Sequence, residues 1–176
     1  MRNIVLKFGL ISGALLSAMM AITIPFQDTI GFDLGMVVGY TTMVLAFLFV
    51  YFGVRSYRDT VAGGSLTFGR AFKVGALIAL IASCCYVATW EVMYFKFMPD
   101  FAEKMTAQTI AKARAAGESP EAIAKKQQEM AEFEAMYQNP AINAAMTFLE
   151  PLPVALIMTL VSAGLLSRRS VPPRET

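Results

Sequence analysis

Several residues of this chain could bind a ligand. The first group of them follows an apolar run that ends about one third of the way along the chain. The group consists of Arg55, Tyr57, Arg58 and Asp59, with Arg70 shortly after them. Arginine binds phosphate-like anions in a bidentate manner, so any ligand held by Arg55, Arg58 and Arg70 is expected to be anionic. The alternative is a structural role, in which Arg58 pairs with Asp59 or with lipid phosphate and Tyr57 anchors the chain at a membrane surface.

Two acidic residues, Glu91 and Glu150, lie inside or beside apolar runs. An ionisable residue in or near a transmembrane segment suggests a function, because its transfer into lipid is costly. If Glu91 and Glu150 face each other, one carboxyl group could take part in cation or proton movement. The alternative is that both are interfacial acids, hydrogen-bonded to Trp90, to a helix start or to water.

The composition excludes several kinds of catalytic and metal site. The 176 residues include no histidine, which excludes a His-dependent triad and zinc or haem sites within the chain. The adjacent Cys84 and Cys85 are expected to be small buried hydrophobic residues, with a redox pair as the alternative. No nucleotide loop, nucleophile motif or metal-ligand cluster is present. We therefore expect no enzyme activity and no cofactor.

The hydropathy of the chain indicates a membrane protein. Hydrophobic residues make up 56% of it, and the mean hydropathy is +0.54, which is too apolar for an ordinary soluble domain. The net charge of only +2 argues against a nucleic-acid partner. We expect one membrane domain, residues 1–176, with transmembrane helices at about 4–26, 34–54, 70–95 and 150–167.

The basic residues predict the orientation of these helices, because Lys and Arg concentrate in short cytoplasmic segments. The short connection 27–33 contains none of them. The predicted cytoplasmic side carries Arg2, Lys7, Arg55, Arg58, Arg70, Lys73, Arg168, Arg169 and Arg174. Both termini are therefore expected in the cytoplasm.

Residues 96–140 form the one sizeable segment that is charged and rich in alanine. Ser119 followed by Pro120 is a typical helix start, so we expect helices near 100–115 and 120–137. The second helix carries an apolar stripe of Ile123, Met130, Phe133 and Tyr137. The fold class is thus an all-α membrane protein with an extramembrane helical hairpin between its third and fourth spans. The hairpin either covers the outer surface of the bundle or docks another protein.

Small residues recur at four-residue steps in three of the predicted spans. Such residues let helix backbones approach closely in lipid. The glycines expected in helix contacts are Gly9, Gly13, Gly35, Gly39 and Gly75. These contacts lie within one subunit or, alternatively, at the face of a homo-oligomer.

Four local motifs point to a known family. They are YFGVRSYRD at 51–59, GGSLTFGRAFKVG at 63–75, YVATWE at 86–91 and PDF at 99–101. Together they resemble the bacterial membrane family catalogued as domain of unknown function 4199. The resemblance implies a small multi-pass protein of the bacterial inner membrane, and it implies no particular activity.

These observations favour a scaffold or accessory protein that acts through its outer hairpin or its cytoplasmic loop. Its expected partners are membrane lipid and a protein bound through residues 100–137. The alternative is a subunit of a transporter or channel that uses Glu91 and Glu150. A large apolar face on the hairpin would favour the first function, and a water-accessible path from Glu91 to the cytoplasmic arginines would favour the second.

Overall fold

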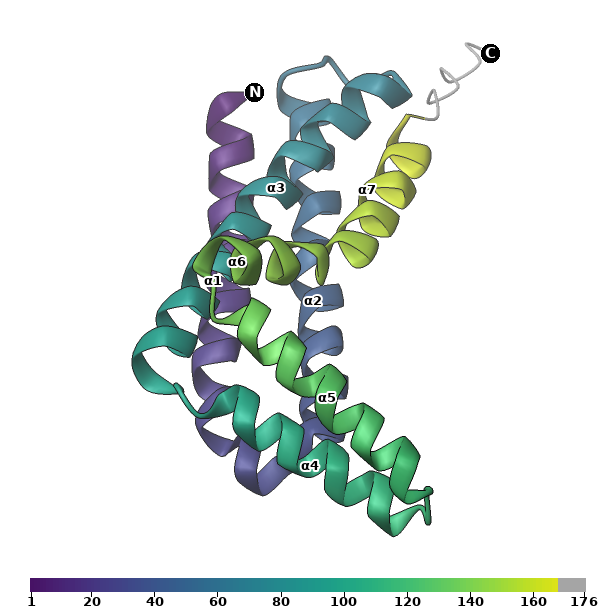
Figure 1. Cartoon of the computed structure of the whole chain (residues 1–176). Coiled ribbons are helices and arrows are strands. Elements are labelled where there is room, and N and C mark those ends of the chain that lie inside the picture. The colour runs from purple at the N-terminus through teal and green to yellow at the C-terminus, as the bar shows by residue number, and fades with distance from the viewer. Residues whose placement is uncertain (168–176) are drawn as a thin grey trace, which may run out of the picture. The chain divides into compact units, whose positions relative to one another are not determined.

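The structure is a computed structural model that describes residues 1–167, apart from the side chains of residues 27, 28 and 32. Within these residues every regular element is a helix (Figure 1). The elements are α1 (Arg2–Thr23), η1 (Ile24–Phe26), α2 (Gln27–Thr60), α3 (Phe68–Val92), η2 (Met93–Phe97), α4 (Phe101–Ala115), α5 (Pro120–Tyr137), α6 (Pro140–Leu149) and α7 (Leu152–Leu166). The predicted cytoplasmic residues Arg168, Arg169 and Arg174 lie outside the described part.

Four helical segments are long and apolar enough to cross a membrane. They are Arg2–Phe26, Asp33–Thr60, Phe68–Phe97 and Pro140–Leu166. Helices α4 and α5 pair with each other between the third and fourth of these segments. The prediction of an all-helical, four-span membrane protein with an inserted helical hairpin is therefore confirmed.

The chain divides into two compact units. The bundle unit consists of Met1–Val87 and Phe148–Thr176, and the hairpin unit consists of Ala88–Thr147. Helix α3 begins in the bundle unit and ends in the hairpin unit, and α6 joins the hairpin unit to α7.

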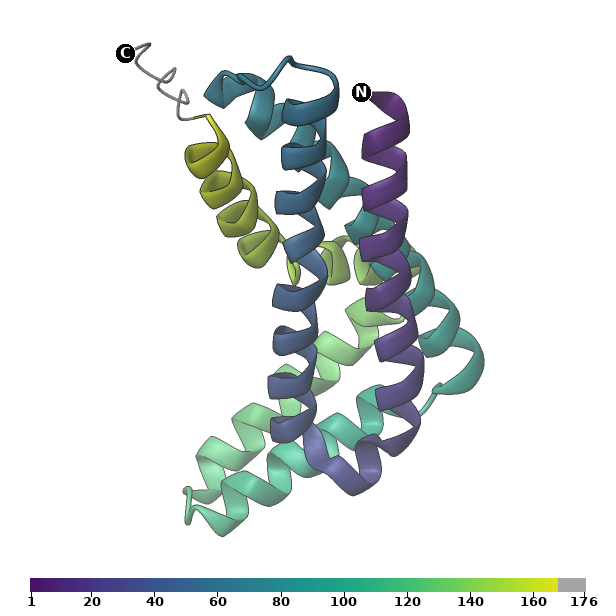
Figure 2. The ribbon, with the colours of Figure 1, turned by 180° about the vertical axis from the view of Figure 1, so that it is seen from behind.

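In the bundle unit, α1 packs along α2 and α2 packs along α7. The first residues of α1, the connection between α2 and α3, and the last turn of α7 all lie at one end of the unit (Figures 1 and 2). We call this the basic end, because it carries the described members of the predicted cytoplasmic set: Arg2, Lys7, Arg55, Arg58, Arg70 and Lys73.

The core of the bundle unit is apolar, and so is much of its outside. Phe47, Val50 and Ile78 are fully buried, whereas Leu34 and Val37 are each 62% exposed. A helix that is hydrophobic all round lies either in a large core or in lipid. Because this unit is too small to bury both faces of its helices, the exposed apolar faces are those that contact lipid in a multi-pass membrane protein.

Helix α1 meets α3 through two glycines. A Cβ atom added to Gly9 would lie 2.8 Å from the Cβ atom of Ile81, and one added to Gly13 would lie 2.7 Å from the Cβ atom of Cys85. Real Cβ atoms do not approach other carbon atoms this closely. The two helices are therefore as near as they are because these positions carry no side chain.

Two further glycines bring α3 against α2 and α7. A Cβ atom on Gly75 would lie 3.0 Å from Thr159 of α7 and 3.1 Å from Val50 of α2. A Cβ atom on Gly53 would lie 2.4 Å from the end of the Ile78 side chain. Helix α3 thus has close contacts with all three of the other long helices of the bundle unit.

The glycine ridge expected on α2 is not continuous. A Cβ atom on Gly39 would have no neighbour within 4 Å. At Gly31 the helix is interrupted by a residue with φ of 77° and ψ of 159°, a conformation that favours glycine. The predicted connection 27–33 is therefore a helical turn followed by a kink.

One buried hydrogen bond also joins α1 to α2. The hydroxyl group of Ser12, which is fully buried, donates to the carbonyl oxygen of Ala46 at 2.8 Å. Such bonds between membrane helices each contribute about 0.6 kcal/mol on average. This hydrogen bond is directional, whereas the rest of the contact between α1 and α2 is van der Waals packing.

In the hairpin unit, α4 and α5 lie side by side and run in opposite directions (Figure 1). The turn between them has Gly117 with φ of 73° and an ion pair between Glu118 and Lys126. The hydroxyl group of Ser119 accepts a hydrogen bond from the backbone N–H of Ala122 at 3.2 Å and caps α5. The two helices have the bounds that the sequence indicates, because these signals are local.

Helix α6 was not predicted from the sequence. The fourth span, expected at 150–167, is built from α6 and α7, which are separated by Glu150 and Pro151. Helix α7 alone has 15 residues and is roughly 22 Å long. It is therefore shorter than the hydrocarbon thickness of a bilayer, about 30 Å.

The glycine contacts give a direct prediction about stability. We expect Gly13→Ala to lower the unfolding free energy by about 1–3 kcal/mol, because its new methyl group would overlap Cys85. Gly39→Ala is the matched control, since it has open space and gains helix propensity. Unfolding of both variants in detergent measures the difference, and equal stability of the two would contradict the packing described here.

Candidate functional site

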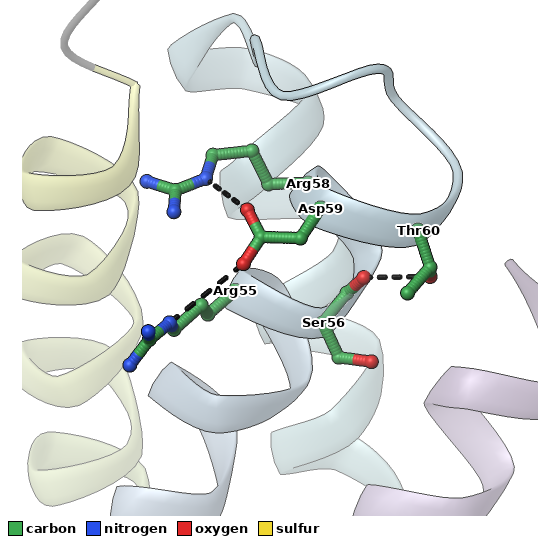
Figure 3. Close-up of polar contacts among 5 residues, drawn as sticks. All are labelled: Arg55, Ser56, Arg58, Asp59 and Thr60. Carbon is green, nitrogen blue, oxygen red and sulfur yellow. Dashed lines mark hydrogen bonds and ion pairs between the residues drawn. The ribbon is translucent and has the colours of Figure 1, made fainter. Parts of the chain in front are cut away.

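Arg55, Arg58 and Asp59 form an ion-pair group in the last turns of α2 (Figure 3). The Nε atom of Arg58 donates to Oδ1 of Asp59 at 2.7 Å. The Nε atom of Arg55 lies 3.7 Å from Oδ2 of the same carboxylate. One carboxylate is therefore shared by two guanidinium groups, those of Arg55, four positions before Asp59, and of the adjacent Arg58.

The two arginines extend in the same direction from α2, toward α7 (Figure 3). Both use their Nε atoms for Asp59, so their Nη atoms point away from the carboxylate. The side chains of Arg55 and Arg58 are 55% and 26% exposed. The group carries a net charge of +1 and holds two hydrogen-bonding forks near each other.

Tyr57 and Arg70 are not part of this group. Tyr57 is only 8% exposed and belongs to the apolar core with Val54 and Leu66. Arg70 is exposed in the first turn of α3, and in the described part of the chain no ion pair joins it to Asp59. Of the five residues considered together in the sequence, three are brought into contact.

Glu150 lies between α6 and α7, where the fourth span is broken. The hydroxyl group of Tyr86 donates to Oε2 of Glu150 at 2.7 Å. Both residues belong to the bundle unit, and they join α3 to the start of α7. Tyr86 is a partner that the sequence does not indicate, because 64 residues separate it from Glu150.

Glu91 belongs to the hairpin unit, and its pairing with Glu150 stays a prediction. The Nε1 atom of Trp90 and the Oε1 atom of Glu91 are both buried, and neither has a hydrogen-bond partner among the described residues. Of the alternative partners considered for Glu91, which were Trp90, a helix start and water, Trp90 is therefore not one. The two side chains are neighbours in sequence but not partners.

Aromatic side chains hold the two hairpin helices against the end of α3 and η2. The rings of Trp90 and Phe101 meet edge to face at 5.0 Å, and those of Tyr94 and Tyr137 at 5.2 Å. Phe133 stacks on Tyr137 at 5.1 Å. Trp90 and Tyr94 are both buried. We call these five residues the aromatic cluster.

A buried amide near this cluster was also missed from the sequence. Asn143 has no exposed surface. Its Nδ2 atom donates to the carbonyl oxygen of Tyr137 at 3.1 Å, and its Oδ1 atom accepts from Thr147 at 3.3 Å. The signal that could have found it is a single amide side chain within the apolar sequence of α6.

No metal centre is found in the described residues, where no group of three or more Cys, Asp or Glu side chains converges. Cys84 is exposed, which differs from the expected burial, and Cys85 is half-buried against Gly13. The sites that could act chemically are therefore the arginine group on α2 and the carboxyl groups of Glu91 and Glu150.

The comparison with protein families confirms the resemblance seen in the motifs. The family model described as "Protein of unknown function (DUF4199)" matches residues 7–168. The comparisons with curated proteins and with solved structures give no match. A function must therefore be argued from the geometry of this chain.

The different surroundings of Tyr57 and Arg58 predict different effects of substitution. We expect Tyr57→Ala to lower the unfolding free energy by about 3 kcal/mol, because it removes a buried aromatic ring. Arg58→Gln should change it by less than about 1 kcal/mol, since its ion pair is partly exposed. Unfolding in detergent tests both, and comparable losses in the two variants would show that Arg58 is structural.

Proposed function

Because this chain belongs to the DUF4199 family, whose description names no activity, we propose a function from its geometry. It is a non-enzymatic scaffold or accessory protein of the bacterial inner membrane, and it binds a partner protein through helices α4 and α5. The observation that supports this proposal most directly is the aromatic cluster, which fixes a hairpin whose remaining surface is polar.

The exposed surface of the hairpin is made of small and charged side chains. Ala107, Ala111 and Ala115 follow one exposed line on α4. On α5 an exposed ion pair joins Lys125 to Glu129. Among the described residues of α4 and α5, the exposed large hydrophobic side chain is that of Met136. The large apolar face expected of a docking hairpin is therefore not found on the described residues of α4 and α5. The polar surface instead suits a partner recognised by shape and charge, in a complex that can dissociate.

The rigidity of the hairpin favours binding. An element that is already ordered loses little conformational freedom when it binds. The aromatic cluster, the cap at Ser119 and the buried amide of Asn143 all restrict the hairpin unit. Such order is expected of a docking element and is not needed in a solvated linker.

We propose that the basic end of the bundle unit faces the cytoplasm. Its Lys and Arg residues lie in short segments, which is the arrangement of cytoplasmic loops. The hairpin, inserted after an odd number of spans from that side, then lies on the outer side. The partner is accordingly an extracytoplasmic protein or the extracytoplasmic part of another membrane protein.

In-cell crosslinking tests the partner and the orientation together. Photoreactive residues at the exposed positions Ala107 and Ala131 should both capture the same extracytoplasmic protein, whereas the half-buried Ile123 should not. Glu132→Lys should lower the yield several-fold by reversing a surface charge. Crosslinks only to lipid or to the chain itself would contradict the scaffold. A cytoplasmic protein captured through the hairpin would reverse the orientation.

A second candidate function is a subunit of a transporter or channel. The specific observation in its favour is the break in the fourth span, with Glu150 at the break and Tyr86 bonded to it. Transporters commonly form their binding sites at discontinuous helices. The buried, unpartnered Oε1 atom of Glu91 is a further polar group within the described spans that a transported ion could contact.

Flux through reconstituted vesicles separates the two functions. For a scaffold we expect the full chain to pass protons and monovalent cations no faster than empty vesicles. For a transporter subunit, flux should be present, should be lost in Glu150→Gln and should fall several-fold in Tyr86→Phe. Flux that survives Glu150→Gln would exclude this carboxyl group from the pathway.

A further inference from the structure

We propose that Arg55, Arg58 and Asp59 form a binding site for the phosphate group of an anionic membrane lipid. We call these three residues the phosphate clamp. The inference does not depend on the proposed function, because it concerns residues of the bundle unit and not the hairpin. It rests on the position of the clamp along α2, on its geometry and on the surface beneath it.

The clamp lies at the level where lipid phosphates are found. Residues 34–54 contain no charged side chain, and as a helix they extend about 32 Å. This length matches the hydrocarbon thickness of a bilayer. Arg55 is the first charged residue after this segment, so it and the next turn of α2 enter the headgroup region.

The shared carboxylate brings two guanidinium groups together and orients them. Asp59 accepts from Nε of Arg58 and attracts Nε of Arg55, and both arginines extend toward the same side of α2 (Figure 3). Their Nη atoms then point away from the carboxylate as two hydrogen-bonding forks, on the side of α2 that is toward α7. A phosphodiester offers two oxygen atoms that share one negative charge, and charge-assisted forks of this kind bind such oxygens in a bidentate manner.

The charge of the clamp selects an anionic lipid. One carboxylate and two guanidinium groups leave a net charge of +1, which complements the single uncompensated charge of phosphatidylglycerol. In phosphatidylcholine the choline group already compensates the phosphate. Lys and Arg residues near the cytoplasmic surface generally attract anionic lipids, and here the attraction is directed by a fixed pair.

The surface below the clamp favours a lipid over free phosphate. Three exposed apolar side chains precede Arg55 on the same side of α2. They are Phe52 one turn before it (47% exposed), Leu48 two turns before it (39%) and Val44 three turns before it (44%). Apolar side chains at this spacing form a continuous strip along a helix. The acyl chains of a lipid whose phosphate occupies the clamp can lie along this strip, whereas inorganic phosphate gains nothing from it.

Spin-labelled lipids test the clamp in the full chain. The protein is reconstituted in phosphatidylcholine vesicles, and the motionally restricted fractions of labelled phosphatidylglycerol and phosphatidylcholine give its relative affinity for each. We expect the wild type to prefer phosphatidylglycerol. Arg55→Lys with Arg58→Lys, which keeps the charge and removes the forks, should lower the preference about fivefold, the equivalent of roughly 1 kcal/mol.

Asp59→Asn gives the decisive comparison. It raises the net charge of the basic end by one, so non-specific attraction would strengthen the preference for phosphatidylglycerol. The clamp requires the opposite, because the two guanidinium groups lose the carboxylate that orients them. A preference in Asp59→Asn equal to or above that of the wild type would overturn the proposal.

Two controls complete the experiment. The first is Lys112→Gln with Arg114→Gln, which removes two positive charges from α4 and should leave the preference unchanged. Inorganic phosphate titrated into the protein in neutral detergent should not bind measurably. Binding of inorganic phosphate that depends on Asp59, without a preference for phosphatidylglycerol, would assign the site to a soluble anion and reject the lipid.

Discussion

Close contact between helix backbones is the constraint on which the bundle unit depends. In lipid the hydrophobic effect does not drive helices together, so van der Waals contact over a large area must do so. Helix α3 achieves this contact on three sides, at Gly13 against Cys85, at Gly75 against Thr159 and at Gly53 through Ile78. The connection that precedes α3 lies at the same end of the unit as the start of α1 and the last turn of α7 (Figure 2).

The hairpin unit depends on a different interaction, the burial of aromatic and polar groups against each other. Its helices have few large aliphatic side chains, and the buried rings of Trp90 and Tyr94 pack against the ring of Phe101. A buried amide is costly unless its hydrogen bonds are made. Asn143 meets this requirement through the carbonyl oxygen of Tyr137, and it thereby fixes where α6 begins relative to α5.

Features of this chain that depend on neighbouring residues could be predicted, and features that depend on distant contacts could not. The hairpin bounds follow from local signals such as Ser119. The contact at Gly53 was missed because no small residue lies four positions away to mark a ridge, while Gly39 lies in such a ridge and has no close neighbour. Likewise the burial of Trp90 comes from a ring that lies eleven positions later in the chain, which periodicity along one helix cannot indicate.

The YFGVRSYRD segment shows why a motif alone does not separate structural from functional residues. Val54 and Tyr57 turn toward the core, while Arg55 and Asp59 lie on the exposed side of the same helical turns. A helix places residues three positions apart on one face, so the two roles alternate within nine residues. Loss of Tyr57 would move the helix that carries the arginines, and loss of the arginines would leave the core in place. Only the second change isolates what the charged face of α2 does.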